Sequence, residues 1–364
     1  MTNERKKNDN FTDRQTDRQT DRQTDRQTDR QTDRQTDRQT WIDSCRGIGI
    51  VLVVLGHCGS PFTKYIYAFH MPLFYALSGL LWHRHATVKQ MTINNGGKYL
   101  RPYFILCTVN LILNMLYIRA RDGTAVALNW TKHFVVGILY SRGTREWMPN
   151  CSPLWFLTSL FAALFIYELI DYAGNQGLKI ILIAAGAVFS YLLAWQDSPK
   201  LIWNIDSALM AIPFIEFGHQ IRMRLCNGWE MAQRNRTVFM LVLMLLYVIC
   251  VKYNTETVSF DNNRYGDALF MFCGALAATA GLFYLSIVYL DRANFFSWIG
   301  RHTIFVVGFD YFSKFVAEWT LNKVNLYGWF SLFISKMILL IIGVFIWGRI
   351  IKIFPKKIER CLRF

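Results

Sequence analysis

The chain has 364 residues, of which 53% are hydrophobic, 16% are aromatic and only 18% are charged, whereas about 25% of the residues in a soluble domain are charged. Its formal net charge of +15 comes from basic residues that lie between long apolar runs, where they set membrane topology. The composition therefore argues against a soluble domain and against nucleic acid as a partner. The eight cysteines show neither metal-ligand spacing nor the pattern of a disulfide framework, so no metal site is expected.

A short repeat lies near the start of the chain. Residues 12–39 are seven consecutive copies of Thr-Asp-Arg-Gln. Each copy has no net charge and no apolar residue to bury, which predicts a disordered cytoplasmic tail over residues 1–40 rather than a signal peptide. The same unit can be encoded by the tetranucleotide ACAG read three times. Gain or loss of one four-base unit would shift the reading frame, so the repeat also favours phase variation of the gene, with the peptide as a by-product.

Apolar runs of roughly twenty residues recur from Trp41 to the end of the chain, the length that a helix needs to cross a hydrocarbon core of about 30 Å. We therefore expect an all-α, polytopic integral membrane protein with about ten transmembrane helices, in a membrane domain over residues 41–352 that is followed by a basic cytoplasmic tail at 353–364. The predicted spans are 42–60, 65–84, 99–118, 152–171, 178–195, 201–221, 236–252, 267–290, 295–318 and 328–352.

Lysine and arginine in the connections between these spans predict the orientation. If the N-terminus is inside, the inner connections and the C-terminal tail carry more of these residues than the outer connections do, so both termini are expected in the cytoplasm. The outer connection at 119–151 is a basic exception. It also contains aromatic and aliphatic residues, which predict a helix lying at the membrane interface.

Ionisable side chains inside membrane spans are costly and are therefore candidates for function. Arg46 and His57 are eleven residues apart in the first span, so both project from one helix face, about 16 Å apart along the axis. His70 lies near the outer end of the second span, where it could share a cavity with His57. A structural explanation stays open for each: Arg46 could reach lipid headgroups, His57 could be hydrogen-bonded between helices, and Ser78 and Gly79 could serve close helix packing alone.

These residues resemble the membrane acyltransferase-3 family, and the resemblance covers roughly residues 41–350. Each motif is short, but their order and spacing together are specific. The matching segments are Arg46-x10-His57, Phe-His-x-Pro-Leu-Phe from residue 69 with Ser-Gly at 78–79, Lys-Tyr-Leu-Arg-Pro-Tyr at 98–103, Pro-Leu-Trp-Phe-Leu at 153–157, Asp206 to Gly218 with its Pro-Phe pair, and Gly-Arg-His-Thr at 300–303.

The resemblance implies an integral-membrane O-acyltransferase in a bacterial inner membrane, in contact with membrane lipids. Acetyl-CoA, or another acyl-CoA that is not aminoacyl, would be the donor. A hydroxyl of a cell-surface carbohydrate such as lipopolysaccharide or capsule would be the acceptor, and no metal is implied. Two positions depart from the family pattern: Asp310 stands where many relatives have histidine, and Glu216 stands where relatives are usually apolar.

Carried over by position, Arg46 and His57 match the family's functional pair and are the expected catalytic residues. The remaining expected site residues are substrate-binding: His70, Ser78, Arg101 and Trp155. Histidine suits removal of a hydroxyl proton near neutral pH, or it could carry the acetyl group transiently. Arginine could bind coenzyme phosphates or the thioester oxygen. The alternative hypothesis is a transporter of polysaccharide or lipid-linked sugar. Such a transporter would more often show internal repeats in its spans.

Overall fold

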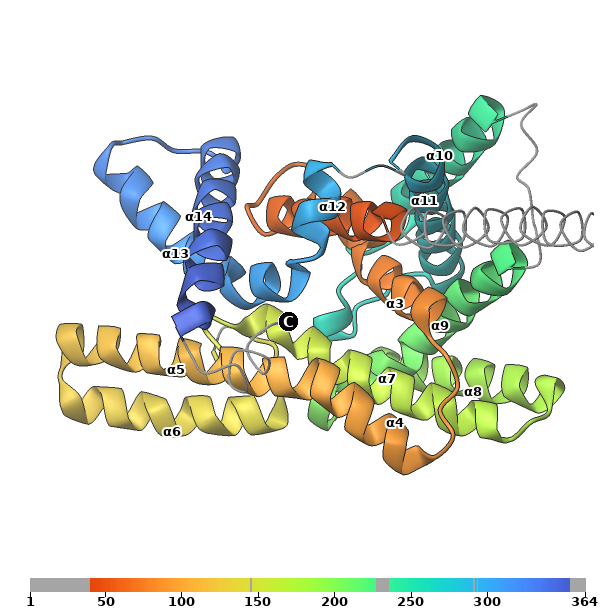
Figure 1. Ribbon diagram of the computed structural model, residues 1–364, viewed down its shortest axis with the longest axis horizontal. Helices are drawn as coiled ribbons and strands as arrows, with labels where there is room; N and C mark the ends of the chain where they lie inside the picture. Colours follow the sequence, from red (N-terminus) through yellow and green to blue (C-terminus); the bar gives the residue numbers. More distant parts are fainter. Residues whose placement is uncertain (1–39, 145, 227–235, 291, 293, 354–364) are drawn as a thin grey trace, which may run out of the picture.

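The computed structural model describes residues 40–144, 146–226, 236–290, 292 and 294–353. In this part of the chain the secondary structure is helical (Figure 1), apart from a single bridge between Ser259 and Arg264. This confirms the all-α fold. The predicted repeat tail, apart from residue 40, and the basic tail from residue 354 onward lie outside the described residues.

The first described helix covers residues 40–56 and is called the 40–56 helix. The longer helices that follow are α3 (His70–Leu81), α4 (Val88–Asn95), α5 (Arg101–Asp122), α6 (Thr124–Tyr140), α7 (Trp155–Tyr172), α8 (Gln176–Trp195), α9 (Ile205–Cys226), α10 (Arg236–Tyr253), α11 (Ala268–Tyr289), α13 (Thr303–Lys323) and α14 (Trp329–Ile350). The shorter elements used below are α2 (Thr63–Tyr67), α12 (Phe295–Gly300) and the π-helical turn η1 (Gly96–Leu100).

Five helical segments of the described chain are long and apolar enough to cross a membrane. Their outer faces are apolar too: Ile181 on α8, Leu269 on α11 and Phe345 on α14 are 63%, 68% and 62% exposed. Large aliphatic and aromatic side chains on an outer surface match a hydrocarbon solvent, so the chain is a membrane protein. The five segments are Val88–Asp122, Ser152–Tyr172, Gln176–Trp195, Ala268–Tyr289 and Trp329–Ile353.

Three predicted spans are built differently in the structure, and the helix of the first ends at residue 56 rather than 60, just before His57. The second span divides into α2 and α3, and the ninth divides into α12 and α13 at residues 301–302. The third begins earlier than expected, because α4 continues through η1 into α5. The connection at 119–151 contains a helix, α6, which lies alongside α5 (Figure 1); its expected place at the membrane interface stays a prediction.

Two close crossings of helices position the residues of the site. Gly79 of α3 faces α9, and a Cβ added there would lie 1.9 Å from the backbone oxygen of Ile215. Gly47 of the 40–56 helix faces α12 in the same way, with the backbone oxygen of Phe296 at 1.9 Å. Small residues allow membrane helices to approach this closely. The second crossing fixes the helix that carries Arg46, and that His57 directly follows, against α12, which leads into α13.

Candidate active site

His57 follows the 40–56 helix directly and pairs with an aspartate that is distant in sequence. Its Nδ1 lies 2.6 Å from Oδ2 of Asp310 on α13, and the side chains are 12% and 1% exposed. In neutral histidine Nδ1–H donates to the carboxylate, which leaves Nε2 as the nitrogen that can accept a proton. The contact therefore fixes both the orientation and the tautomer of the imidazole.

The second oxygen of Asp310 contacts a buried lysine. Oδ1 lies 2.8 Å from Nζ of Lys336 on α14, whose side chain is 0% exposed. A buried charge is tolerated only when it is paired, so the carboxylate and the ammonium stabilise each other. Lys314, one turn beyond Asp310 on α13, donates from Nζ to the backbone oxygen of His57 at 2.7 Å. Two helices thus hold the histidine, α13 directly and α14 through Asp310.

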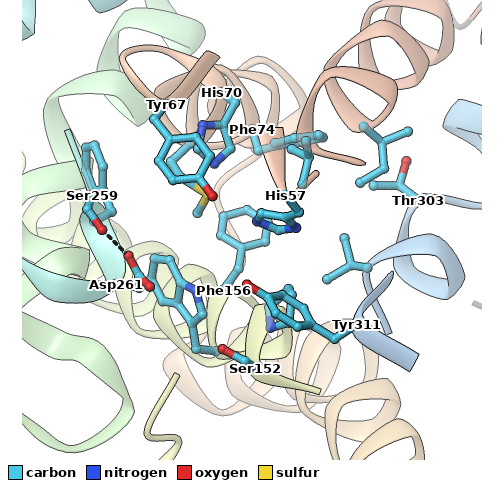
Figure 2. A pocket seen from close by; sticks show the side chains of 17 residues that line it. His57, Tyr67, His70, Phe74, Ser152, Phe156, Ser259, Asp261, Thr303 and Tyr311 are labelled. Atoms are coloured by element: carbon cyan, nitrogen blue, oxygen red, sulfur yellow. Dashed lines mark hydrogen bonds between the residues drawn. The ribbon is translucent and has the colours of Figure 1, made fainter. Parts of the chain in front are cut away.

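A small aromatic cavity surrounds His57 (Figure 2); we call it the His57 cavity. It encloses about 80 Å³. His70 shares it and is itself buried, with Nδ1 3.0 Å from the backbone oxygen of Ile66. The ring centroid of Tyr67 lies 6.1 Å from that of His57 and 5.0 Å from that of His70. The other lining residues include Phe74, Ser152, Trp155, Phe156, Ser259, Phe260, Asp261, Thr303, Val307 and Tyr311.

A larger cavity of about 600 Å³ lies next to it. Its described lining contains four basic residues and no acidic residue; we call it the basic cavity. Four residues line both cavities, so the two spaces adjoin along a common wall made of Phe74, Phe156, Thr303 and Val307. The basic residues are Arg46, Lys98, Arg101 and Arg301. Arg46 also contacts Asp43, one turn earlier on the same helix, with Nη1 3.5 Å from Oδ1.

The structure divides the six predicted site residues equally. His57, His70 and Trp155 line the His57 cavity, and Arg46, Ser78 and Arg101 line the basic cavity. Arg46 and His57, expected to act together from one helix face, therefore meet different spaces on the two sides of the common wall. The hydroxyl of Ser78 donates to the backbone oxygen of Phe74 at 2.9 Å.

Sequence reasoning recorded Asp310 only as a departure from the family pattern and missed Lys336. A signal for both was present, because each is an ionisable residue inside an apolar span. Glu216, the other departure, lines neither cavity. Its Oε2 lies 2.9 Å from Nζ of Lys179 and accepts from the hydroxyl of Tyr167 at 2.6 Å. Its charge is therefore balanced within the protein.

Comparison with known proteins gives two kinds of match. A family model described as an acyltransferase domain matches residues 39–225, just over half of the chain. The nodulation protein NolL of Mesorhizobium japonicum is 24% identical over 264 residues, which cover 65% of this chain and 64% of the relative.

The nodulation protein NolL of Sinorhizobium fredii is 27% identical over 267 residues, which cover 65% of this chain and 66% of the relative. The chain therefore spans slightly less than two thirds of these relatives' lengths. No solved structure matches the chain significantly. The range of the family model includes all six predicted site residues, whereas Asp310 and Lys336 lie beyond it.

Proposed function

Since the chain belongs to the membrane acyltransferase-3 family, we propose that it transfers an acetyl group from acetyl-CoA to a hydroxyl of a cell-surface carbohydrate, such as lipopolysaccharide, capsule or a related glycan. One observation carries the proposal: an oriented histidine–aspartate pair faces a cavity that adjoins a larger, basic cavity. The histidine–aspartate pair provides a base, and the basic cavity suits a polyanionic donor.

His57 acts as the general base in the proposed reaction. Nε2 removes the proton of the acceptor hydroxyl while its oxygen attacks the thioester carbon. The carbon–sulfur bond then breaks, and the coenzyme thiolate takes the proton back from the imidazolium. Asp310 holds the imidazole in the required tautomer and balances its positive charge during the step, as a carboxylate does in other histidine-based acyl transfer. Thioester, alcohol and protons balance without any further reactant.

The basic cavity binds the donor. Phosphate groups of acyl-CoA are attracted by clustered guanidinium and ammonium groups, and a guanidinium can bind a phosphate with two parallel hydrogen bonds. Arg46 and Arg101 supply such contacts, and Ser78 lines the same space. The acetyl group then reaches the common wall, on whose other side His70 and Trp155 help to hold the carbohydrate near His57.

The proposed setting is a bacterial inner membrane with both termini in the cytoplasm, where acetyl-CoA is available to the basic cavity. Basic residues in the predicted inner connections support this orientation. A reporter fused to the C-terminus should therefore be active in the cytoplasm, and periplasmic activity would reverse the assignment. Phase variation through the repeat is part of the proposal at the level of the gene. Sequencing many colonies should show the tract changing in four-base steps.

Replacing the base tests the function. His57→Ala should abolish O-acetylation of surface glycans while membrane abundance stays normal. His83, which is exposed and lines neither cavity, provides the matched control, because His83→Ala should leave acetylation unchanged. Mass analysis of glycans from cells without the gene, complemented with each variant, gives the readout. Normal acetylation in cells with His57→Ala would refute the proposed role.

A further inference from the structure

One wall of the His57 cavity comes from the connection between α10 and α11, residues 254–267, called the 254–267 loop. Ser259, Phe260 and Asp261 of this loop line the cavity. In the view of Figure 2, Ser259 and Asp261 lie across the cavity from Thr303, with His57 between. Asp261 is the one acidic side chain among the described lining residues, and none of these is lysine or arginine.

The loop is held in place by its own backbone and by a buried aromatic side chain. Ser259 and Arg264 exchange two backbone hydrogen bonds of 2.7 and 2.9 Å. Phe260 between them is 2% exposed and packs against Phe214 and Tyr265, with ring centroids 6.4 and 5.3 Å away. The loop therefore presents Asp261 from a fixed hairpin.

A lysine whose side chain is 10% exposed ties the hairpin to α9. Nζ of Lys200 donates to the backbone oxygen of Phe260 at 3.1 Å and to Oδ1 of Asn263 at 2.7 Å. It also lies 3.3 Å from Oδ1 of Asp206, and Nδ2 of Asn263 donates to the second oxygen of that carboxylate at 2.6 Å. A wall organised in this way before binding does not have to be ordered by the ligand, which favours affinity and selectivity.

The chemistry of this wall limits what it can bind. An ionised carboxylate only accepts hydrogen bonds and offers about four acceptor sites, one of which takes the hydroxyl of Ser259. Its other sites suit the hydroxyl or ammonium groups of a sugar. A sugar carboxylate at the same place would meet a like charge in a cavity with no lysine or arginine in its lining, where repulsion is stronger than in water.

We propose that Asp261 recognises the acceptor and that the acetylated unit is a neutral or amino sugar, not an acidic one. The aromatic rings of Tyr67, Trp155, Phe156 and Tyr311 contact the carbon face of the sugar ring, while Asp261 binds its hydroxyl edge. A few placed polar groups within an apolar lining are the usual arrangement of a selective site for a small ligand. This inference rests on the proposed function, because it assigns the acceptor of the same reaction.

The test uses the full-length protein in detergent with radiolabelled acetyl-CoA. The acceptor probe is glycan extracted from cells that lack the gene and freed of O-acetyl groups by mild alkali. Asp261→Asn should lower kcat/KM for the glycan about tenfold, the loss expected when a charge-assisted hydrogen bond becomes a neutral one, without changing KM for acetyl-CoA. Tandem mass spectrometry of the labelled glycan should place the new acetyl group on a sugar without a carboxylate.

Two control variants separate recognition from loop structure. Glu256→Gln makes the same chemical change at an exposed position of the loop that does not line the His57 cavity, and it should leave both constants unchanged. Ser259→Ala removes the hydrogen bond to Asp261 but keeps the carboxylate, so it should lower kcat/KM for the glycan less than threefold.

The outcomes distinguish this inference from the function on which it rests. An acetyl group on an acidic sugar, wild-type kinetics in Asp261→Asn, or an equal loss in Ser259→Ala would each overturn the role of Asp261 while leaving acetyl transfer intact. If the wild-type protein labels no glycan at all, the proposed function fails and the inference falls with it.

Discussion

The two cavities differ in size and charge although they share a wall. The basic cavity encloses about 600 Å³ and is lined by four basic residues, whereas the His57 cavity encloses about 80 Å³ and has Asp261 as the acidic residue of its described lining. One suits a large polyanion and the other suits a small neutral ring. In the proposed reaction these cavities are the donor and acceptor sites, and Phe156 and Thr303 are part of the wall that they share.

The largest effect is expected when the carboxylate that contacts His57 is removed, because this tests whether the His57 cavity provides the base. Asp310→Asn should lower the transfer rate about 10³- to 10⁴-fold, because an amide can no longer hold the imidazole in the productive tautomer. It should also destabilise the protein by about 3–5 kcal/mol, since Lys336 is left buried and unpaired. Transfer kinetics and thermal unfolding in detergent measure the two effects.

A double variant separates catalysis from folding at this position. Asp310→Asn combined with Lys336→Met removes both buried charges, so it should recover most of the lost stability and none of the lost activity. Asp197→Asn, which makes the same chemical change at an exposed turn, is the matched control and should change neither the stability nor the transfer rate. A transfer rate within tenfold of wild type in the double variant would show that Asp310 does not assist His57.

A smaller effect is expected from salt, which should weaken binding in the basic cavity and leave binding in the His57 cavity nearly unchanged. Binding of a polyanion to a basic site weakens as ions screen the charges, whereas binding of a neutral sugar does not. Raising KCl from about 50 to about 500 mM should increase KM for acetyl-CoA several-fold and change KM for the glycan less than about twofold. Two-substrate initial rates give both constants. Parallel changes in the two would mean that one site binds both substrates.

The repeat should affect neither cavity. All residues that line the two spaces follow residue 40, so a chain that starts with a new methionine before Thr40 should insert and acetylate at the wild-type rate. The control is the full-length chain at equal abundance in the membrane. Slower acetylation by the shortened chain would show that the repeat peptide contributes to function and is more than a by-product of a DNA tract.

Much of the fold follows from the sequence because apolar length and polar connections report directly on membrane helices. The breaks in two spans were not predicted. The second break is at residues 301–302, directly after Gly300, where a Cβ would lie 1.9 Å from the backbone oxygen of Asp43. Such a contact joins segments distant in sequence, and spacing along one helix carries no information about it.

The contacts within the candidate active site could not be predicted from the sequence either. Helical periodicity placed Arg46 and His57 on one face, but the wall between them is made by side chains from α3, α7 and α13. The partnership of His57 with Asp310 joins positions 253 residues apart. The sequence marks each of these ionisable residues as a candidate, and only the packing of the helices shows which of them meet.

The division between donor and acceptor is tested most directly by the affinity for CoA of two variants that lie eleven residues apart in one segment. Isothermal titration calorimetry in detergent gives Kd for Arg46→Lys and His57→Ala. We expect His57→Ala to bind CoA as the wild type does, although it transfers no acetyl group. Arg46→Lys should bind CoA at least about tenfold more weakly, because a point charge does not replace the planar guanidinium. Weakened binding in His57→Ala together with unchanged binding in Arg46→Lys would contradict the assignment of the two cavities.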